Sequence, residues 1–169
     1  SPLIASETGG ADVSVNESFN KEGLWLTEIY QNDVDRSVKN NSREKSGYES
    51  IRLYKSTTDL MEFVEITSTY ENPVNFNDTY EFVYNDTVQK VTTMDDNADV
   101  VIQPEEKVVL WNYRSDVTTT IPTEAEFREE MRIPDDAVVL KVTSGVNWGV
   151  TSTFSLKTKA GNNVVSTFT

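Results

Sequence analysis

Short runs of β-branched and aromatic residues, separated by turn-forming residues, recur along this chain and constrain its fold more than any other feature. Each run spans five to seven residues, which is the length of a strand rather than of a helix. Their number and spacing predict an all-β, antiparallel sandwich or barrel. The runs are LWLTEIY (24–30), YESIRLY (48–54), MEFVEIT (61–67), TYEFVYN (79–85), ADVVI (98–102), KVVLWNY (107–113), AVVLKVT (137–143), STFSLKT (152–158) and VVSTFT (164–169).

One segment departs from the strand pattern and predicts a short helix at about 123–132. Thr123 followed three positions later by Glu126 is a capping box, the usual start of a helix. An apolar stripe accompanies it, formed by Ala125, Phe127 and Met131. We expect this helix to be a crossover that covers one open end of the sandwich.

The beginning of the chain differs in composition from the rest. Residues 1–22 are small, polar and aperiodic, which predicts a flexible tail or linker, so that the β-sandwich domain comprises residues 23–169. The chain has 169 residues, of which 37% are hydrophobic, enough for one domain with one core. It contains no apolar run of the roughly 18 residues that span a membrane, so we expect any anchoring or export segment to lie outside it.

Charge and missing residue types narrow the classes of function. The 28 acidic and 15 basic residues give a net charge of −13, which repels phosphate backbones and makes nucleic acid an unfavoured partner. The chain has no cysteine and no histidine. It therefore lacks thiolate nucleophiles, cysteine-ligated zinc and the commonest general base. We expect a chain that is not an enzyme and needs no cofactor.

The glutamates of the strand runs are the most conspicuous candidates for chemistry. Glu62 and Glu65 stand three residues apart, so on a strand they project to opposite faces and cannot form a catalytic pair. Glu28 and Glu65 each end an apolar row of one face, the rows being Leu24, Leu26 and Glu28, and Met61, Phe63 and Glu65. This pattern predicts that Glu28 and Glu65 are structural carboxylates, bound by backbone N–H groups or by basic side chains.

An acidic stretch offers a weaker alternative, a calcium site. Four residues occupy positions 1, 3, 5 and 12 of a loop like that of an EF-hand, namely Asp95, Asn97, Asp99 and Glu106. Val100 stands where that loop needs glycine, and both flanks are predicted strands rather than helices. These departures favour a solvated turn over calcium binding.

One stretch, residues 36–55, is basic in an otherwise acidic chain. Six basic residues against Glu44 and Glu49 give it a local charge of +4, and the six are Arg36, Lys39, Arg43, Lys45, Arg52 and Lys55. They form a candidate basic loop for an anionic polymer, although such loops are more often only solvated. Of the three tryptophans, which more often belong to a core than to a sugar-binding platform, we expect Trp148 to be the most exposed.

Taken together, several runs resemble the lamin tail domain family in its bacterial extracellular form. The resemblance covers about residues 24–169 and depends on the order and spacing of LWLTEIY, DLMEFVEITSTYENPVNF (59–76), TYEFVYND, DVVIQPEEKVVLWNY (99–113) and the closing VVLKVTSGVNWGVTSTFSLKTKAGNNVV. It implies an immunoglobulin-like β-sandwich. The chain departs from the family pattern at Glu105, where a turn glycine is usual, and in a long insertion over residues 33–58.

The resemblance also implies a function and a location. It suggests a non-catalytic extracellular or cell-surface module that binds or tethers within a larger bacterial protein, with a protein or a cell-surface polymer as its partner. The alternative is an accessory substrate-recognition domain of a metallophosphoesterase or nuclease whose catalytic domain lies outside this chain. Such enzymes hold two metals with clustered histidine and acidic ligands, and this chain has no histidine.

Overall fold

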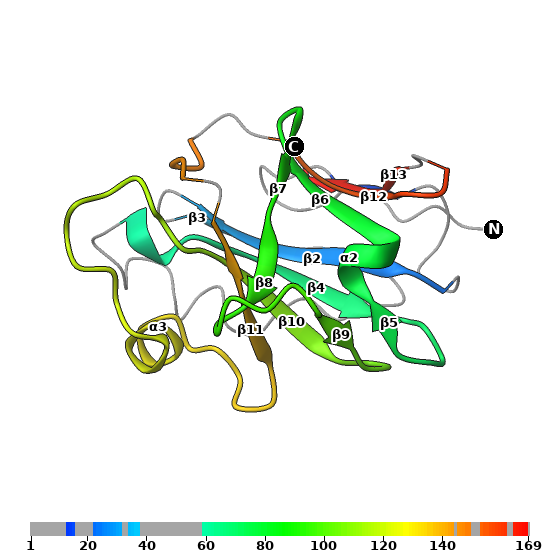
Figure 1. The fold of residues 1–169 in the computed structure, drawn as a ribbon, viewed down its shortest axis with the longest axis horizontal. Helices are drawn as coiled ribbons and strands as arrows, with labels where there is room; N and C mark the ends of the chain where they lie inside the picture. Colours follow the sequence, from blue (N-terminus) through cyan, green and yellow to red (C-terminus); the bar gives the residue numbers. More distant parts are fainter. Residues whose placement is uncertain are drawn as a thin grey trace.

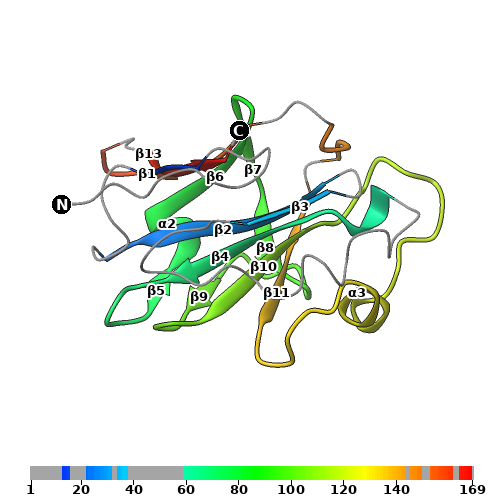
Figure 2. The same ribbon diagram turned by 180° about the vertical axis from the view of Figure 1, so that it is seen from behind.

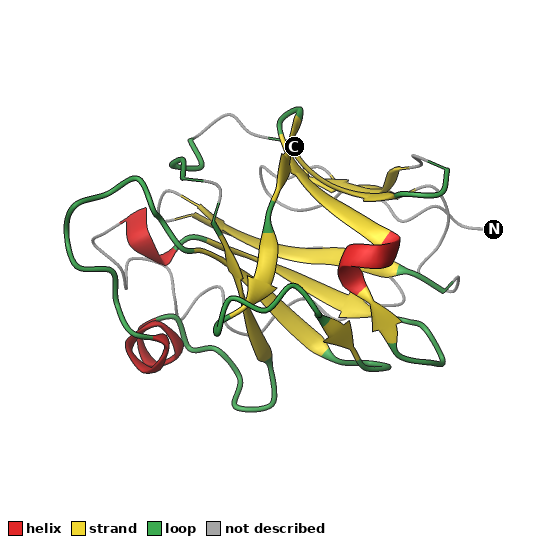
Figure 3. Cartoon of the chain, viewed as in Figure 1, coloured by secondary structure: helices red, strands yellow, loops and turns green. Residues whose placement is uncertain are grey.

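The computed structural model describes residues 13–15, 22–31, 34–37, 59–143, 145–149, 153–161 and 164–168. Within them the chain forms two stacked β-sheets, a small third sheet and a short helix on the outside (Figure 1), and strands far outnumber helices (Figure 3). The prediction of an all-β sandwich with a short helix near residues 123–132 is confirmed.

The two large sheets have five and six strands, which are named here in the order in which they lie side by side. The five-stranded sheet consists of β1 (Val13–Val15), β13 (Val164–Phe168), β12 (Phe154–Thr158), β6 (Tyr80–Tyr84) and β7 (Thr87–Gln89). The six-stranded sheet consists of β3 (Val34–Ser37), β2 (Leu24–Gln31), β4 (Phe63–Ser68), β10 (Lys107–Asn112), β11 (Val138–Val142) and β8 (Val91–Thr93). The small sheet pairs β5 (Val74–Asn75) with β9 (Val101–Ile102), and the helical segments are the 3-10 helix η1 (Asp59–Met61), α2 (Phe76–Thr79) and α3 (Glu124–Glu130).

Strand direction follows from the connections. The strand pairs among the described residues are antiparallel, except that β10 and β11 run parallel. Parallel neighbours need a long crossover connection, and α3 lies in the connection between these two strands (Figure 1). The helix therefore is a crossover, as the sequence predicts.

The main core lies between the two large sheets. Alternate residues of the six-stranded sheet, such as Leu26, Val64 and Leu110, pack there against Phe82 and Phe154 of the five-stranded sheet. These side chains are fully buried. This is the arrangement that period-two alternation in the strand runs predicts.

A second core covers the other face of the six-stranded sheet and includes Phe63 and Trp111. Figure 2 shows the fold from behind. The ring of Phe127 from α3 stacks on Trp111 with centroids 4.3 Å apart and planes 10° apart. The capping box of α3 is present, since Thr123 Oγ1 accepts from the Glu126 N–H at 3.1 Å and Glu126 Oε1 accepts from the Thr123 N–H at 2.9 Å.

Two details of the helix prediction are wrong. The helix covers the outer face of the six-stranded sheet and not an open end of the sandwich, because β10 is apolar on both faces and its outer residues need cover. The buried stripe of the helix consists of Phe127 and Met131, whereas Ala125 is exposed. One helical turn separates the two buried residues, so Ala125 lies on a different face.

A β-bulge in β2 overturns the expectation that Leu24, Leu26 and Glu28 share one face. The pairing of β2 with β4 shifts register between Leu26 and Glu28, which adds one residue, Thr27, to β2. Leu24, Leu26 and Ile29 therefore enter the main core. Glu28 pairs with Glu65 on the outer face, because an inserted residue reverses the alternation of side chains.

Part of the expected N-terminal tail belongs to a sheet. Residues 13–15 form β1, which pairs with β13 at the edge of the five-stranded sheet, while residues 1–12 and 16–21 lie outside the described residues. The division into a tail and a domain at residue 22 stays a prediction. In the part of the chain that the structure describes, no helix is both long enough and apolar enough to cross a membrane.

The position of α3 makes a prediction about stability. Phe127→Ala should lower the free energy of unfolding by about 3–5 kcal/mol, because it removes a buried ring and leaves a cavity against Trp111. Denaturant unfolding measures this change. Glu129→Ala, at an exposed position of the same helix, should change stability by less than about 0.5 kcal/mol. Equal effects of the two substitutions would contradict the packing of α3 on the sheet.

Candidate functional site

A polar network surrounds the loop that follows β11, which we call the Trp148 loop (residues 145–149). Glu62 directly precedes β4 and is only 1% exposed. Its Oε1 accepts hydrogen bonds from the backbone N–H of Trp148 at 3.0 Å and from Nδ2 of Asn112 at 3.3 Å. Burying a carboxylate is costly unless donors compensate for lost water, and here a backbone donor does so. Glu62 thus anchors the loop.

Other polar side chains hold the same loop from both sheets. They come from the ends of β10, β2 and β6, and the bonds are Asn112 Nδ2 to the Val146 carbonyl (2.9 Å), Gln31 Nε2 to the Trp148 carbonyl (3.3 Å) and the Gly149 N–H to Tyr84 Oη (3.1 Å). Because each bond joins a different strand to one loop, the loop ties the two sheets together at this end of the sandwich.

The side chain of Trp148 fills the core below the loop. It is 0% exposed and packs edge-on against Phe154, with centroids 5.0 Å apart, and against Phe82 at 6.0 Å. The expectation that Trp148 is the most exposed tryptophan is wrong, because the hydrogen bonds of the loop turn it inward. Trp25 and Trp111 are buried as well. All three tryptophans are among the described residues, and none presents an open face on which a sugar could stack.

The loops after β10 and β11 approach each other closely near Gly145. Its φ of +75° lies in the left-handed region, which favours glycine. A Cβ added there would lie 3.3 Å from Oγ of Ser115. The sequence therefore places glycine where the turn and the neighbouring loop both require it.

An ion cluster fixes the loop after β10 to η1. The buried guanidinium of Arg114 donates to both carboxylate oxygens of Asp116 at 2.6 Å and to Oδ2 of Asp59 at 3.1 Å. The hydrogen bonds from Arg114 lower the pKa of Asp116, and the bonds to Asp116 raise the pKa of Arg114. This arginine is therefore committed to two carboxylates of its own chain.

Glu28 and Glu65 are brought together by the pairing of β2 with β4, where they lie directly opposite each other. Both are buried. Thr27 Oγ1 donates to Glu65 Oε1 at 2.7 Å, so the extra residue of the bulge supplies a donor to this carboxylate. Like charges in opposed positions repel, so these carboxylates require compensation within the fold. The structural role of Glu28 and Glu65 stays a prediction.

Of the candidate basic loop, only Arg36 belongs to the described residues. It lies in β3 and is half-buried, and its Nη2 donates to Oε1 of Gln31. Burial lowers the pKa of Arg36. The other members lie outside the described residues and are Lys39, Arg43, Lys45, Arg52 and Lys55.

The acidic stretch considered for calcium forms a turn between β8 and β9. The exposed residues of this turn bind one another and a neighbouring segment, since Asn97 Oδ1 accepts from the Asp99 N–H and Asp99 Oδ1 accepts from Asn75 Nδ2. Glu106 follows β9 and is half-buried, and its Oε1 accepts from the Gln103 N–H. Asn97, Asp99 and Glu106 therefore each bind a group of their own chain. Among the described residues no group of three or more acidic side chains is placed to hold a metal ion.

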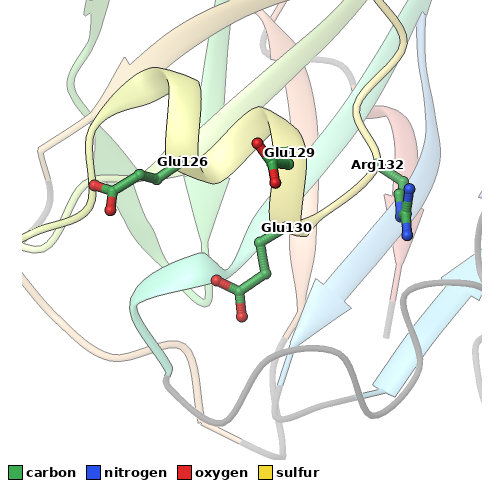
Figure 4. A pocket seen from close by; sticks show the side chains of 4 residues that line it. All are labelled: Glu126, Glu129, Glu130 and Arg132. Atoms are coloured by element: carbon green, nitrogen blue, oxygen red, sulfur yellow. The ribbon is translucent and has the colours of Figure 1, made fainter.

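An open hollow of about 450 Å³ lies beside α3 and is lined by Glu126, Glu129, Glu130 and Arg132 (Figure 4). Figure 4 shows the side chains of Glu126 and Glu130 pointing in different directions from the helix. Glu126 Oε1 is already bonded to the Thr123 N–H of the capping box, a bond that lowers the pKa of Glu126. The hollow is thus lined mainly by acidic side chains, one of which takes part in the helix cap.

Fold and network together define an all-β sandwich whose buried polar side chains hold loops and join sheets. Comparison with known proteins found no family model and no curated protein that matches this sequence.

The anchoring of the Trp148 loop by Glu62 is a role that the sequence does not predict. The strand pattern separates this residue correctly from Glu65, since Glu62 binds the Trp148 loop and Glu65 lies on the outer face. The available signal is its position at the start of an apolar run, where a charged side chain next to the core needs a partner. The sequence alone cannot name that partner, because Trp148 lies 86 positions away.

The anchoring role of Glu62 predicts a local loss of protection. In Glu62→Ala, amide hydrogen exchange in residues 145–149 should accelerate, and the free energy of unfolding should fall by about 1–3 kcal/mol, because buried donors lose their acceptor. Mass-spectrometric hydrogen exchange follows the loop. Glu62→Gln, which keeps an acceptor oxygen, should retain most of the protection. Unchanged exchange in Glu62→Ala would rule out the anchor.

The Arg114 cluster predicts a dependence on pH. The pKa of Asp116 is lowered in the folded state, so its ionised form stabilises the fold above the ordinary carboxyl range, and this contribution is lost as pH falls below about 4. The wild-type Tm should exceed that of Asp116→Asn at pH 7, and the difference should shrink toward pH 3. Asp95→Asn, an exposed control, should show no such trend. A difference that is independent of pH would contradict the assignment.

Proposed function

We propose that this chain is a non-catalytic binding or tethering module of a larger bacterial surface or secreted protein, of the lamin tail type. The observation that supports it best is the use of the polar side chains. Glu62, Arg114 and Asp99 are each bonded to the chain's own backbone or side chains. Their donors and acceptors hold loops, so they are not poised to act on a substrate.

The second support is architectural. A sandwich whose loops are fixed by buried bonds presents rigid strand edges and loop tips, and binding residues are commonly displayed on such surfaces. The resemblance to lamin tail domains adds the extracellular location and the role as an attached module. The charge of −13 disfavours anionic partners, so among cell-surface polymers the proposal favours peptidoglycan over teichoic acid.

Co-sedimentation tests the proposal directly. The purified chain should sediment saturably with Gram-positive peptidoglycan from which teichoic acid has been removed, and less with untreated walls. In parallel, bis(p-nitrophenyl) phosphate with Mn²⁺ should not be hydrolysed, because the chain has no histidine to serve in the two-metal site of such a phosphoesterase. Turnover that copurifies with the chain would overturn the non-catalytic assignment, and absence of binding to either wall preparation would remove the polymer as partner.

Nucleic acid recognition for an attached nuclease is the competing function, and a gel shift with duplex DNA at low salt separates the two. The proposal expects no shift, because the net charge opposes the phosphate backbone. A shift that disappears when Arg43 and Lys45 are both changed to Glu would favour the nuclease-associated role instead.

A further inference from the structure

The edge of the five-stranded sheet at β7 carries an exposed apolar side chain. Among the strands that the structure describes, β7 is the last of its sheet, and Val88 at its centre is 54% exposed. β6 and β7 form a hairpin in which only Asn85 and Asp86 separate the paired residues Tyr84 and Thr87. An open strand edge of this kind is a template for pairing with a further strand.

The register of the hairpin determines which backbone groups face outward. With a two-residue connection, Tyr84 and Thr87 form the hydrogen-bonded pair that closes the hairpin, and such pairs alternate with non-bonded pairs along an antiparallel ladder. Val88, opposite Val83, is in a non-bonded pair. Its N–H and C=O therefore point away from β6 and toward the open edge.

The hairpin is also held in place. The Asn85 N–H donates to the Thr153 carbonyl at 2.7 Å, and Asn85 Oδ1 accepts from the Thr153 N–H at 2.9 Å. At the other end of β7, the Lys90 carbonyl accepts from the Thr143 N–H at 3.2 Å, where the chain passes into β8 and the other sheet (Figure 1). The open edge, β7 with the flanking residues Asp86 and Lys90, is thus held at both of its ends.

The charges on this segment are arranged for pairing with itself. Val88 alternates with Thr87 and Gln89 along β7 and lies on the outer face of the sheet, and Asp86 in the preceding turn and Lys90 directly after β7 each stand two positions from it. If two copies pair antiparallel about a twofold axis at Val88, Val88 lies opposite Val88. Two positions away, Asp86 of each copy then lies opposite Lys90 of the other. Asp86 and Lys90 are both exposed.

We propose that β7 is a homodimerisation edge, at which two copies of this chain join their five-stranded sheets into one continuous sheet. The backbone of Val88 supplies the central hydrogen bonds, and two Asp86–Lys90 pairs set the antiparallel register. The same lysine, considered in a monomer, guards the edge against indiscriminate pairing. The two roles of Lys90 differ in outcome. A lysine that prevents strand pairing keeps the chain monomeric, whereas a lysine that pairs with Asp86 of a second copy stabilises the dimer.

Sedimentation equilibrium of the full chain tests the proposal over about 10 μM to about 1 mM, since a short edge makes a weak interface. Ionic strength should be about 0.15 M, where the repulsion between chains of charge −13 is screened beyond about 8 Å and the local pairs are not. The expected result is a reversible monomer–dimer equilibrium. A monomer throughout this range would overturn the proposal and leave Lys90 as a guard.

Charge exchange identifies the surface. Asp86→Lys and Lys90→Asp, each alone, place like charges opposite one another twice and should weaken dimerisation by about tenfold or more. Because each variant then carries the complement of the other, an equimolar mixture should form heterodimers, and the double variant D86K/K90D should dimerise like wild type. Lys107→Asp, on β10 of the other sheet, is the control and should have no effect beyond that of net charge.

Val88→Pro gives an independent test. Proline has no backbone N–H, so the substitution removes the outward N–H of residue 88 without removing a hydrogen bond to β6. It should abolish the dimer while circular dichroism remains that of a folded sandwich. If this variant fails to fold, the charge-exchange variants of Asp86 and Lys90 still test whether β7 forms the dimer interface. A dimer that persists unchanged in Asp86→Lys and in Lys90→Asp would show that another surface is used and would overturn the proposal.

Discussion

Strand β10 of the six-stranded sheet is apolar on both faces, and much of the fold follows from the need to cover both. Along β10, Val108 and Leu110 face the main core, while Val109 and Trp111 face the outer one. The five-stranded sheet covers the first face. The second needs a separate cover, and α3 provides it by stacking Phe127 on Trp111. Since that helix must leave from β10 and return to the same sheet, β11 enters parallel to β10 in an otherwise antiparallel arrangement.

Burial also imposes a requirement on the polar groups, because each buried group needs a hydrogen-bond partner. A loop that closes the end of a sandwich brings backbone N–H and C=O groups next to an apolar core, and each must find a partner. Glu62, Asn112 and Gln31 supply these partners to the Trp148 loop, and the indole of Trp148 can then fill the core. The carboxylate and the tryptophan thus depend on each other. The hydrogen bonds to Glu62 hold the loop in the conformation in which the side chain of Trp148 points into the core.

The features that the sequence predicts correctly are local ones. Alternating apolar runs define most strands, and the Thr123–Glu126 capping box defines the start of α3, because each signal lies within a few neighbouring residues. The bulge at Thr27 escapes prediction, since threonine is an ordinary strand residue and only the pairing with β4 shows that it is inserted. The burial of Trp148 and the position of α3 escape for the same reason. One depends on Glu62, and the other on the register that makes the outer face of β10 apolar.

These constraints also bear on the surface proposed for association. The buried polar groups at the Trp148 loop are committed to holding it, so contacts with other molecules fall to strand edges and loop tips. At β7 the chain leaves one sheet and, after Lys90, enters the other, which leaves a short edge supported at both ends. A longer exposed edge strand would pair with other chains without selectivity, and an edge strand covered by another segment would not pair at all. In the proposed dimer, the short edge of β7, with Asp86 and Lys90 two positions to either side of Val88, allows pairing in one register, and this makes selective association compatible with an exposed strand.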